Sequence, residues 1–358
     1  IFNTIETPKI SALEHSLYLS NEQKLSSRIS FNYGIRYTLF QNIGPATVYK
    51  FNDKYVCIDT VEYNDWNIYN TYSGMEPRIN GKYSLTENSS IKFACSKTMQ
   101  FLQLASNSTV GTPLDIWVPS SQQIKPQKAM QYTLGYFRNF KRNIIESSIE
   151  FYYKDMRNQI DFRDFAYLLL NPQIEGEFRF GKGKAYGVEF LIRKQTGKLT
   201  GWTSYTLSKS ERKITGINGD RWYRSPYDKT HNVNIVLMYQ LNKRVQLSIN
   251  WVYTTGAPVT FPTGRYTYGA LIAPVYSDRN SYRLPAYHRL DLAVSIEGKE
   301  KPGRKYKGGW NISIYNLYSR HNAYQITFRQ NKEYPEITEA IKTYLFPIIP
   351  SITYNFNF

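Results

Sequence analysis

The feature that most constrains the fold is a strict alternation of apolar and polar side chains over residues 28–39. The apolar set is Ile29, Phe31, Tyr33, Ile35, Tyr37 and Leu39, and the polar set is Arg28, Ser30, Asn32, Gly34, Arg36 and Thr38. Successive side chains of a β-strand point to opposite faces, so the segment predicts a strand with one apolar and one polar face. Burial of the polar face would remove two arginines from water, so only the other face can be buried.

The same alternation recurs along the whole chain. Clear repeats lie near 13–19, 145–154, 188–192, 233–241, 245–253, 290–296 and 310–314, and weaker ones near 76–85, 90–99, 127–138 and 198–209. With the C-terminal segment they predict about thirteen strands, each close to the roughly 9–11 residues that cross a hydrocarbon layer. Strands of globular sheets are nearer five or six residues. The pattern therefore predicts an all-β fold, a transmembrane antiparallel β-barrel.

The aromatic content agrees with a membrane barrel. The chain holds 32 Tyr, 19 Phe and 6 Trp, yet its mean hydropathy is −0.50. A membrane barrel places rings at both interfaces and polar side chains in its lumen. No segment approaches the roughly 18 consecutive apolar residues of a spanning helix, so any membrane span must be β.

Short and long connections alternate between the expected strands. Short ones lie near 21–25, 86–89, 139–143, 195–197, 242–243 and 299–308, and long ones near 41–75, 100–126, 158–184, 210–231, 255–287 and 320–349. Outer-membrane barrels have short periplasmic turns and long extracellular loops. The alternation therefore predicts a location in the Gram-negative outer membrane, with the long connections outside.

The C-terminus carries a further signal. Ile352, Tyr354, Phe356 and Phe358 alternate with Thr353, Asn355 and Asn357. A terminal aromatic strand of this form resembles the signal that the barrel assembly machinery reads. That machinery is therefore an expected partner.

The positive charge does not indicate nucleic acid. The net charge is +17, from 45 Lys and Arg against 28 Asp and Glu. A nucleic-acid-binding surface usually gathers its cations in one patch or helix face, whereas these are scattered along the strands and loops. Contact with lipopolysaccharide phosphates or an anionic solute is the better interpretation.

Catalytic and metal-binding motifs are not evident. The four histidines lie far apart without the spacing of a zinc site, so a metal site is not expected. Cys57 and Cys95 lie in unlike contexts, and the sequence does not decide whether they form a disulfide. The run Gly181–Gly187 is interpreted as a tight turn at a strand entrance. Arg289 and Asp291 are interpreted as a lumenal ion pair or an interface anchor. We expect neither enzymatic activity nor a cofactor.

Several segments together resemble the C-terminal half of TonB-dependent receptors of the Bacteroidetes type. They are Trp117-Val-Pro-Ser-Ser121 with Ile124-Lys-Pro-Gln127, and the segments 150–162, 183–190, 201–210, 255–260, 284–291 and 311–318. The resemblance implies a plug domain inside a barrel of about 22 strands. Residues 1–358 would then be the C-terminal part of that barrel, with the plug and the N-terminal strands absent from this chain.

The resemblance also implies a function. Such receptors import a bulky, scarce solute such as a metal chelate, a glycan or a peptide-like nutrient, with energy from the TonB complex acting through the plug. A surface lipoprotein is a further partner that the resemblance suggests. A passive channel or a structural barrel scaffold stays open as the alternative, because the plug and TonB box that discriminate them lie outside this sequence.

Solute contacts are expected in the long connections, which are rich in rings and cations. Rings stack on apolar or sugar-like surfaces, and arginines hold carboxylate or phosphate oxygens in paired bonds. The same side chains could instead form an aromatic girdle that binds lipopolysaccharide phosphates. The cluster 221–224 is the strongest candidate because it lies in mid-loop. The candidates are Arg221, Trp222, Tyr223, Arg224, Trp66, Trp117, Arg265, Tyr266, Tyr282 and Arg283.

Overall fold

The computed structural model describes residues 10–105, 116–168, 170–269, 271–299, 307–334 and 336–357. They form one large antiparallel sheet in which thirteen strands follow in chain order, and a short strand β13 (Tyr223–Arg224) pairs with β12. The thirteen are β1 (Ser11–Lys24), β2 (Ile29–Ile43), β5 (Ile68–Thr86), β6 (Ser89–Gln100), β9 (Gln127–Phe140), β10 (Ile145–Phe162), β11 (Phe178–Lys194), β12 (Leu199–Ile214), β14 (His231–Asn242), β15 (Val245–Thr254), β20 (Tyr287–Glu297), β21 (Lys307–Tyr315) and β24 (Ile349–Asn357). The all-β prediction and its strand count are confirmed.

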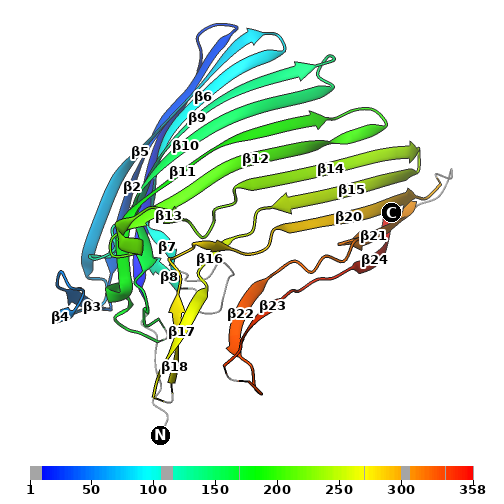
Figure 1. The fold of residues 1–358 in the computed structure, drawn as a ribbon. Coiled ribbons are helices and arrows are strands. Elements are labelled where there is room, and N and C mark those ends of the chain that lie inside the picture. Colours follow the sequence, from blue (N-terminus) through cyan, green and yellow to red (C-terminus); the bar gives the residue numbers. More distant parts are fainter. Residues whose placement is uncertain are drawn as a thin grey trace.

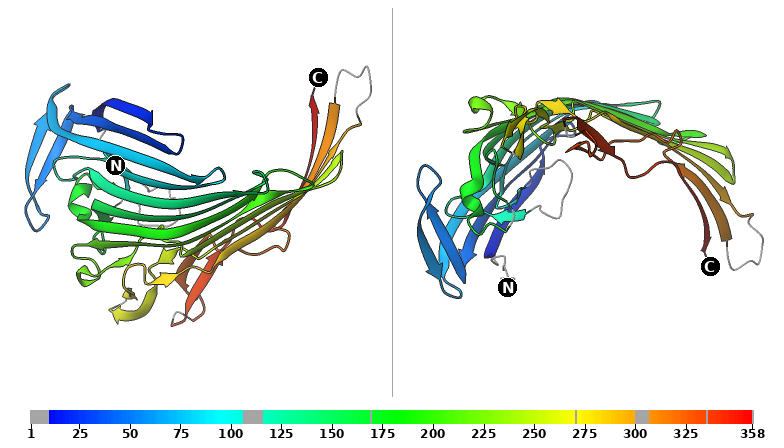
Figure 2. Two further views of the ribbon diagram at one scale, coloured as in Figure 1. Left: turned by 90° about the horizontal axis from the view of Figure 1, so that it is seen from above. Right: turned by 60° about the horizontal axis from the view of Figure 1, so that its bottom comes forward.

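The sheet twists and curves into an open trough (Figures 1 and 2). β1 and β24 form its two rims, and within the described residues each pairs with one neighbour only. Unpaired strand edges in lipid leave backbone groups without hydrogen bonds, which costs several kcal/mol per group.

Small two-stranded sheets, most of them hairpins, occupy the long connections and gather at one end of the large sheet (Figure 1). They are β3 (Ala46–Phe51) with β4 (Cys57–Tyr63), β7 (Leu102–Ala105) with β8 (Ile116–Pro119), β16 (Pro258–Val259) with β19 (Tyr282–Arg283), β17 (Pro262–Tyr268) with β18 (Leu271–Tyr276), and β22 (Gln325–Gln330) with β23 (Thr338–Thr343). Two short 3-10 helices, Ile174–Glu177 and Asn218–Asp220, complete this end. No helix in the described part of the chain is long and apolar enough to cross a membrane.

Strand register places the alternating apolar side chains on one continuous face. Ile35 lies opposite Leu19, and Phe151 lies opposite both Leu134 and Val188. The face continues to the last strand, where Ile312 lies opposite Ile352. Many of these side chains are exposed, including Leu19 at 76% and Ile352 at 66%. An exposed apolar sheet face of this extent needs a non-aqueous environment, which fits the hydrocarbon layer. We call it the apolar face, and the opposite side the polar face.

Strands extend further into the long connections than the sequence predicts. β5 has 19 residues and β10 has 18, more than the roughly 9–11 that cross the hydrocarbon layer. The predicted short turn at 21–25 is wrong: residues 21–24 belong to β1, and the turn lies at 25–28. Ser26 accounts for the shift, because its Oγ accepts the amides of Arg28 and Ile29.

The predicted turn at Gly181–Gly187 is also wrong, because β11 runs through it without interruption. A Cβ at Gly181 would meet the carbonyl oxygen of Lys213 in the paired strand β12. That glycine therefore permits a close approach of two backbones. Cys57 and Cys95 are both free thiols.

Candidate functional site

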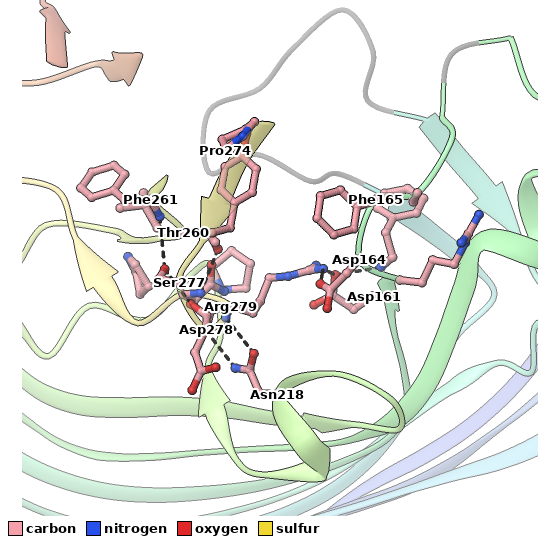
Figure 3. A pocket seen from close by; sticks show the side chains of 18 of the residues that line it. Asp161, Asp164, Phe165, Asn218, Thr260, Phe261, Pro274, Ser277, Asp278 and Arg279 are labelled. Carbon is pink, nitrogen blue, oxygen red and sulfur yellow. Dashed lines mark hydrogen bonds and ion pairs between the residues drawn. The ribbon is translucent and has the colours of Figure 1, made fainter. Parts of the chain in front are cut away.

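A cavity of about 1010 Å³ lies among the long connections at the hairpin end of the sheet (Figure 3). Four connections contribute to its wall: 163–177, 215–230, 255–286 and 316–348. These segments are far apart in sequence but meet here because they join neighbouring strands from β10 to β24.

Arg279 organises the wall of this cavity. Its guanidinium pairs with Asp161 at 2.9 Å and with Asp164 at 2.6 Å, and its side chain is only 18% exposed. The Tyr223 hydroxyl donates to the other oxygen of Asp161 at 2.6 Å. Burial alone would lower the pKa of Arg279, but Asp161 and Asp164 raise it, so the cation is held. Burial, followed by the Asp161 carboxylate, raises the pKa of Tyr223, so its hydroxyl stays a donor.

A β-bulge in β10 turns Asp161 toward this network. The register changes between Arg157, which lies opposite Lys182, and Gln159, which lies opposite Gly181. Without the bulge, Asp161 would share the apolar face with Phe151. The extra residue, Asn158, has a φ of 56° and moves the end of β10 by one position, a known function of bulges near sites.

A second network joins the connections 215–230 and 255–286. Arg283 pairs with Asp228, which is 1% exposed, and donates to Thr230 Oγ1 at 2.9 Å and to the Gly256 carbonyl at 2.9 Å. Asp228 also accepts the Ser210 amide at 2.6 Å, which ties the network to β12. The two connections thus form one braced wall.

Aromatic rings give the cavity its free binding surface. Phe165 is 82% exposed, Tyr266 is 59% and Tyr276 is 50%. Phe165 meets Tyr276 edge-on, with 6.4 Å between ring centroids. Each arginine of the lining already has a carboxylate: Arg163 with Glu177, Arg221 with Asp278, and Arg279 as above. The arrangement favours solutes with flat, apolar or sugar-like faces over solutes held by charge alone.

The connection 163–177 contains two glutamates whose pKa values shift in opposite directions. Burial would raise the pKa of Glu177, but its bonds with Arg163 and the Tyr167 amide lower it. Arg163 Nε lies 2.6 Å from Glu177 Oε2. Burial raises the pKa of Glu175, and a bond with Ser121 opposes this only in part.

The structure divides the candidates that the sequence proposes between the cavity and other places. Arg221 and Tyr266 line it. Tyr223 and Arg283 brace its wall, and Arg224 donates to the Ser281 carbonyl at 3.1 Å. Two candidates lie at its margin: the Tyr282 ring packs against Phe261, with 5.7 Å between ring centroids, and Arg265 lines a neighbouring cavity of about 590 Å³ between the hairpins β17–β18 and β22–β23.

The three tryptophans of the candidate set lie elsewhere. Trp66 and Trp117 are 75% and 61% exposed, and neither lines the cavity. Trp222 lies over the ammonium group of Lys184, 4.3 Å from the ring centroid. Their role in solute contact stays a prediction.

Sequence reasoning missed the residues that build the site. Asp161, Phe165, Tyr276 and Arg279 were not among the candidates, although all four line the cavity. Arg279 and Asp161 lie 118 positions apart, and only the fold brings them together. Within the described residues, no group of three or more His, Cys, Asp or Glu could hold a metal ion.

Two further predictions have clear positions. Arg289 and Asp291 do form an ion pair on the polar face of β20, with Arg289 Nη2 2.9 Å from Asp291 Oδ2, and its place in a lumen or at an interface stays a prediction. Of the C-terminal signal, Ile352, Tyr354 and Phe356 lie exposed in β24, and Phe358 lies outside the described residues. Recognition by the assembly machinery stays a prediction.

Comparison with known proteins agrees with the all-β fold. A family model described as TonB dependent receptor-like, beta-barrel, matches residues 3–317. No curated protein sequence matches the chain.

Solved structures of three receptors share the fold. The siderophore receptor PiuA from Acinetobacter baumannii has 14% identity and a TM-score of 0.62, over 96% of this chain and 43% of that one. The ferric-catecholate import receptor Fiu of E. coli K12 has 15% identity and a TM-score of 0.57, over 96% of this chain and 44% of that one. The ferripyoverdine receptor of the outer membrane of Pseudomonas aeruginosa has 10% identity and a TM-score of 0.58, over 97% of this chain and 39% of that one. The chain thus spans less than half the length of each.

Proposed function

The chain belongs to the TonB-dependent receptor-like β-barrel family, and on that premise we propose that it is the wall of an outer-membrane active transporter that imports a bulky, scarce solute. The similar structures include a ferric-catecholate import receptor and a siderophore receptor, which supports this proposal. A metal chelate, a glycan or a peptide-like nutrient is the proposed solute class. The Bacteroidetes type remains a prediction.

The ring-lined cavity carries the proposal for where solute first binds. It is large enough for a small bulky molecule, since ligand sites usually measure about 300–1,000 Å³. Its exposed rings, Phe165 and Tyr276, stand on connections fixed by Arg279, so binding does not have to order the wall.

The remaining assignments follow from the same proposal. The long connections face outside, the apolar face contacts lipid, and the chain has no enzymatic role. A barrel of about 22 strands would close on β1 and β24, with a plug that contacts the TonB complex. The assembly machinery and a surface lipoprotein are further proposed partners. One similar structure is that of the receptor FpvAI in complex with pyocin S2.

Dependence on TonB tests the function and separates it from the passive alternative. Cells that make the full-length receptor are given limiting solute, with and without the tonB gene. We expect saturable uptake that disappears without TonB. Uptake that persists at the same rate and rises linearly with concentration would instead support a passive channel.

A further inference from the structure

Basic side chains gather on the apolar face of β6, β9, β10, β11 and β12, next to the long connections. We call them the basic band; they are Lys97, Lys128, Arg157, Lys182, Lys184, Lys209 and Lys213. Two acidic residues, Asp155 and Glu211, lie among them on the same face. Alternation places the band on the apolar face, because Lys184 lies six positions before Phe190 and Lys209 lies two after Leu207.

Strand register orders this part of the face into rows. A row of exposed rings comes first, with Tyr132 opposite Tyr153 and Tyr153 opposite Tyr186. The next row is mixed, with Asp155 opposite both Met130 and Lys184, and Lys184 opposite Glu211. The row nearest the long connections is almost wholly basic, since Lys128 lies opposite Arg157, Arg157 opposite Lys182, and Lys182 opposite Lys213. The sequence of apolar rows, tyrosines and then cations matches the acyl, interfacial and headgroup levels of a lipid leaflet.

The two acids of the band are already engaged. Glu211, with 11% of its side chain exposed, lies 2.7 Å from Lys209 and 3.4 Å from Lys184. Asp155 lies 3.4 Å from Arg157. Within the described residues, Lys128, Lys182 and Lys213 have no carboxylate partner. An excess of positive charge therefore remains at the headgroup level, facing lipid.

Trp222 completes the surface from the connection 215–230. Its ring lies 4.3 Å from the Lys184 ammonium and 5.8 Å from that of Lys182, and 38% of the residue is exposed. A ring beside two ammonium groups offers an apolar wall to a lipid whose phosphate binds the lysines. This position accounts for Trp222 lying outside the cavity lining.

We propose that the basic band binds the phosphate groups of a phosphorylated glycolipid of the outer leaflet, with Trp222 packed against the bound lipid. The proposal rests on the orientation proposed above, with the long connections outside. Lysine and arginine form charge-assisted hydrogen bonds with phosphate, and the band presents them where such headgroups lie.

Lipid binding to the purified full-length receptor in detergent tests the proposal. The probes are bisphosphorylated lipid A and the same lipid without phosphates. The variant combines Lys128→Gln, Lys182→Gln and Lys213→Gln, none of which breaks an ion pair. Each lysine near an anionic surface contributes a factor of roughly five, so the three together should weaken binding on the order of 100-fold. The dephosphorylated lipid should bind wild type and variant alike.

A matched control loses the same charge from the polar face through Lys82→Gln, Lys92→Gln and Lys154→Gln, and should bind as wild type does. Equal loss in the control, or no preference of the wild type for phosphates, would overturn the proposal. Heat-modifiable gel mobility checks that each barrel is folded. If the triple variant does not fold, Lys182→Gln alone replaces it, and its lipid binding should be roughly fivefold weaker than that of wild type. The assay needs no solute, so it is independent of the transport proposal.

Discussion

The pairing of Arg279 with Asp161 offers the sharpest energetic prediction. Replacing Arg279 with Met leaves the Asp161 carboxylate, whose side chain is 8% exposed, with the Tyr223 hydroxyl as its side-chain donor. Breaking a buried pair by removing one partner costs about 3–5 kcal/mol. Because Tyr223 remains, we expect about 3 kcal/mol, the lower end of that range. Opening of the connections 163–177 and 255–286, which the ion pairs of Arg279 join, should then become on the order of 100-fold more frequent.

Hydrogen exchange on the full-length receptor measures that opening through the amides of these two connections. The matched control is Arg221→Met, because the pair of Arg221 with Asp278 is 71% and 59% exposed and should contribute less than about 1 kcal/mol. A double variant, Asp161→Leu with Arg279→Met, should exchange more slowly than either single variant, since no uncompensated charge remains. Equal exchange in Arg279→Met and Arg221→Met would refute the reasoning.

Three further predictions address the rings, the pH response and the topology. Phe165→Ala and Tyr276→Ala should each weaken solute uptake at limiting concentration by roughly tenfold, whereas Tyr334→Ala should not, because this exposed ring lies outside the cavity; the reverse order would move the site to the connection between β22 and β23. Burial raises the pKa of Glu175 above its ordinary 4.5, so ionisation of this carboxyl group destabilises the folded connection. Hydrogen-exchange protection of residues 170–177 should therefore fall as the pH rises from 4.5, and it should not change with pH in Glu175→Gln. A fall in both proteins would assign the effect to another group. In a receptor with Cys57 and Cys95 changed to Ser, a cysteine at Gly264 should label on intact cells and one at Thr196 should not; labelling of Thr196 alone would invert the topology. Thr196 is preferred to Gly197, whose φ of 103° would strain a side chain.

The sequence was sufficient for the architecture because a strand of the membrane wall repeats one simple rule. Alternation located even the weaker strands, such as β6 and β12, since each has one face in lipid. Turn positions were less predictable, as the shift from 21–25 to 25–28 shows. That shift depends on Ser26 accepting two amides, a local preference that alternation does not encode.

The cavity was not predictable for a different reason. Its central pair joins Asp161 and Arg279 across 118 positions, and a bulge at Asn158 sets the face on which Asp161 lies. Alternation alone would place Asp161 with the apolar side chains. The mid-loop position of the cluster 221–224 made it the strongest candidate, yet Trp222 in that cluster lies over Lys184.

The most direct test of the central claim is the structure of the full-length receptor with its transported solute bound. We expect solute density inside the cavity, in contact with the rings of Phe165 and Tyr276 and beside a wall in which Arg279 still pairs with Asp161 and Asp164. Solute density confined to the hairpins β3–β4 and β7–β8, with the cavity free of solute, would contradict the account.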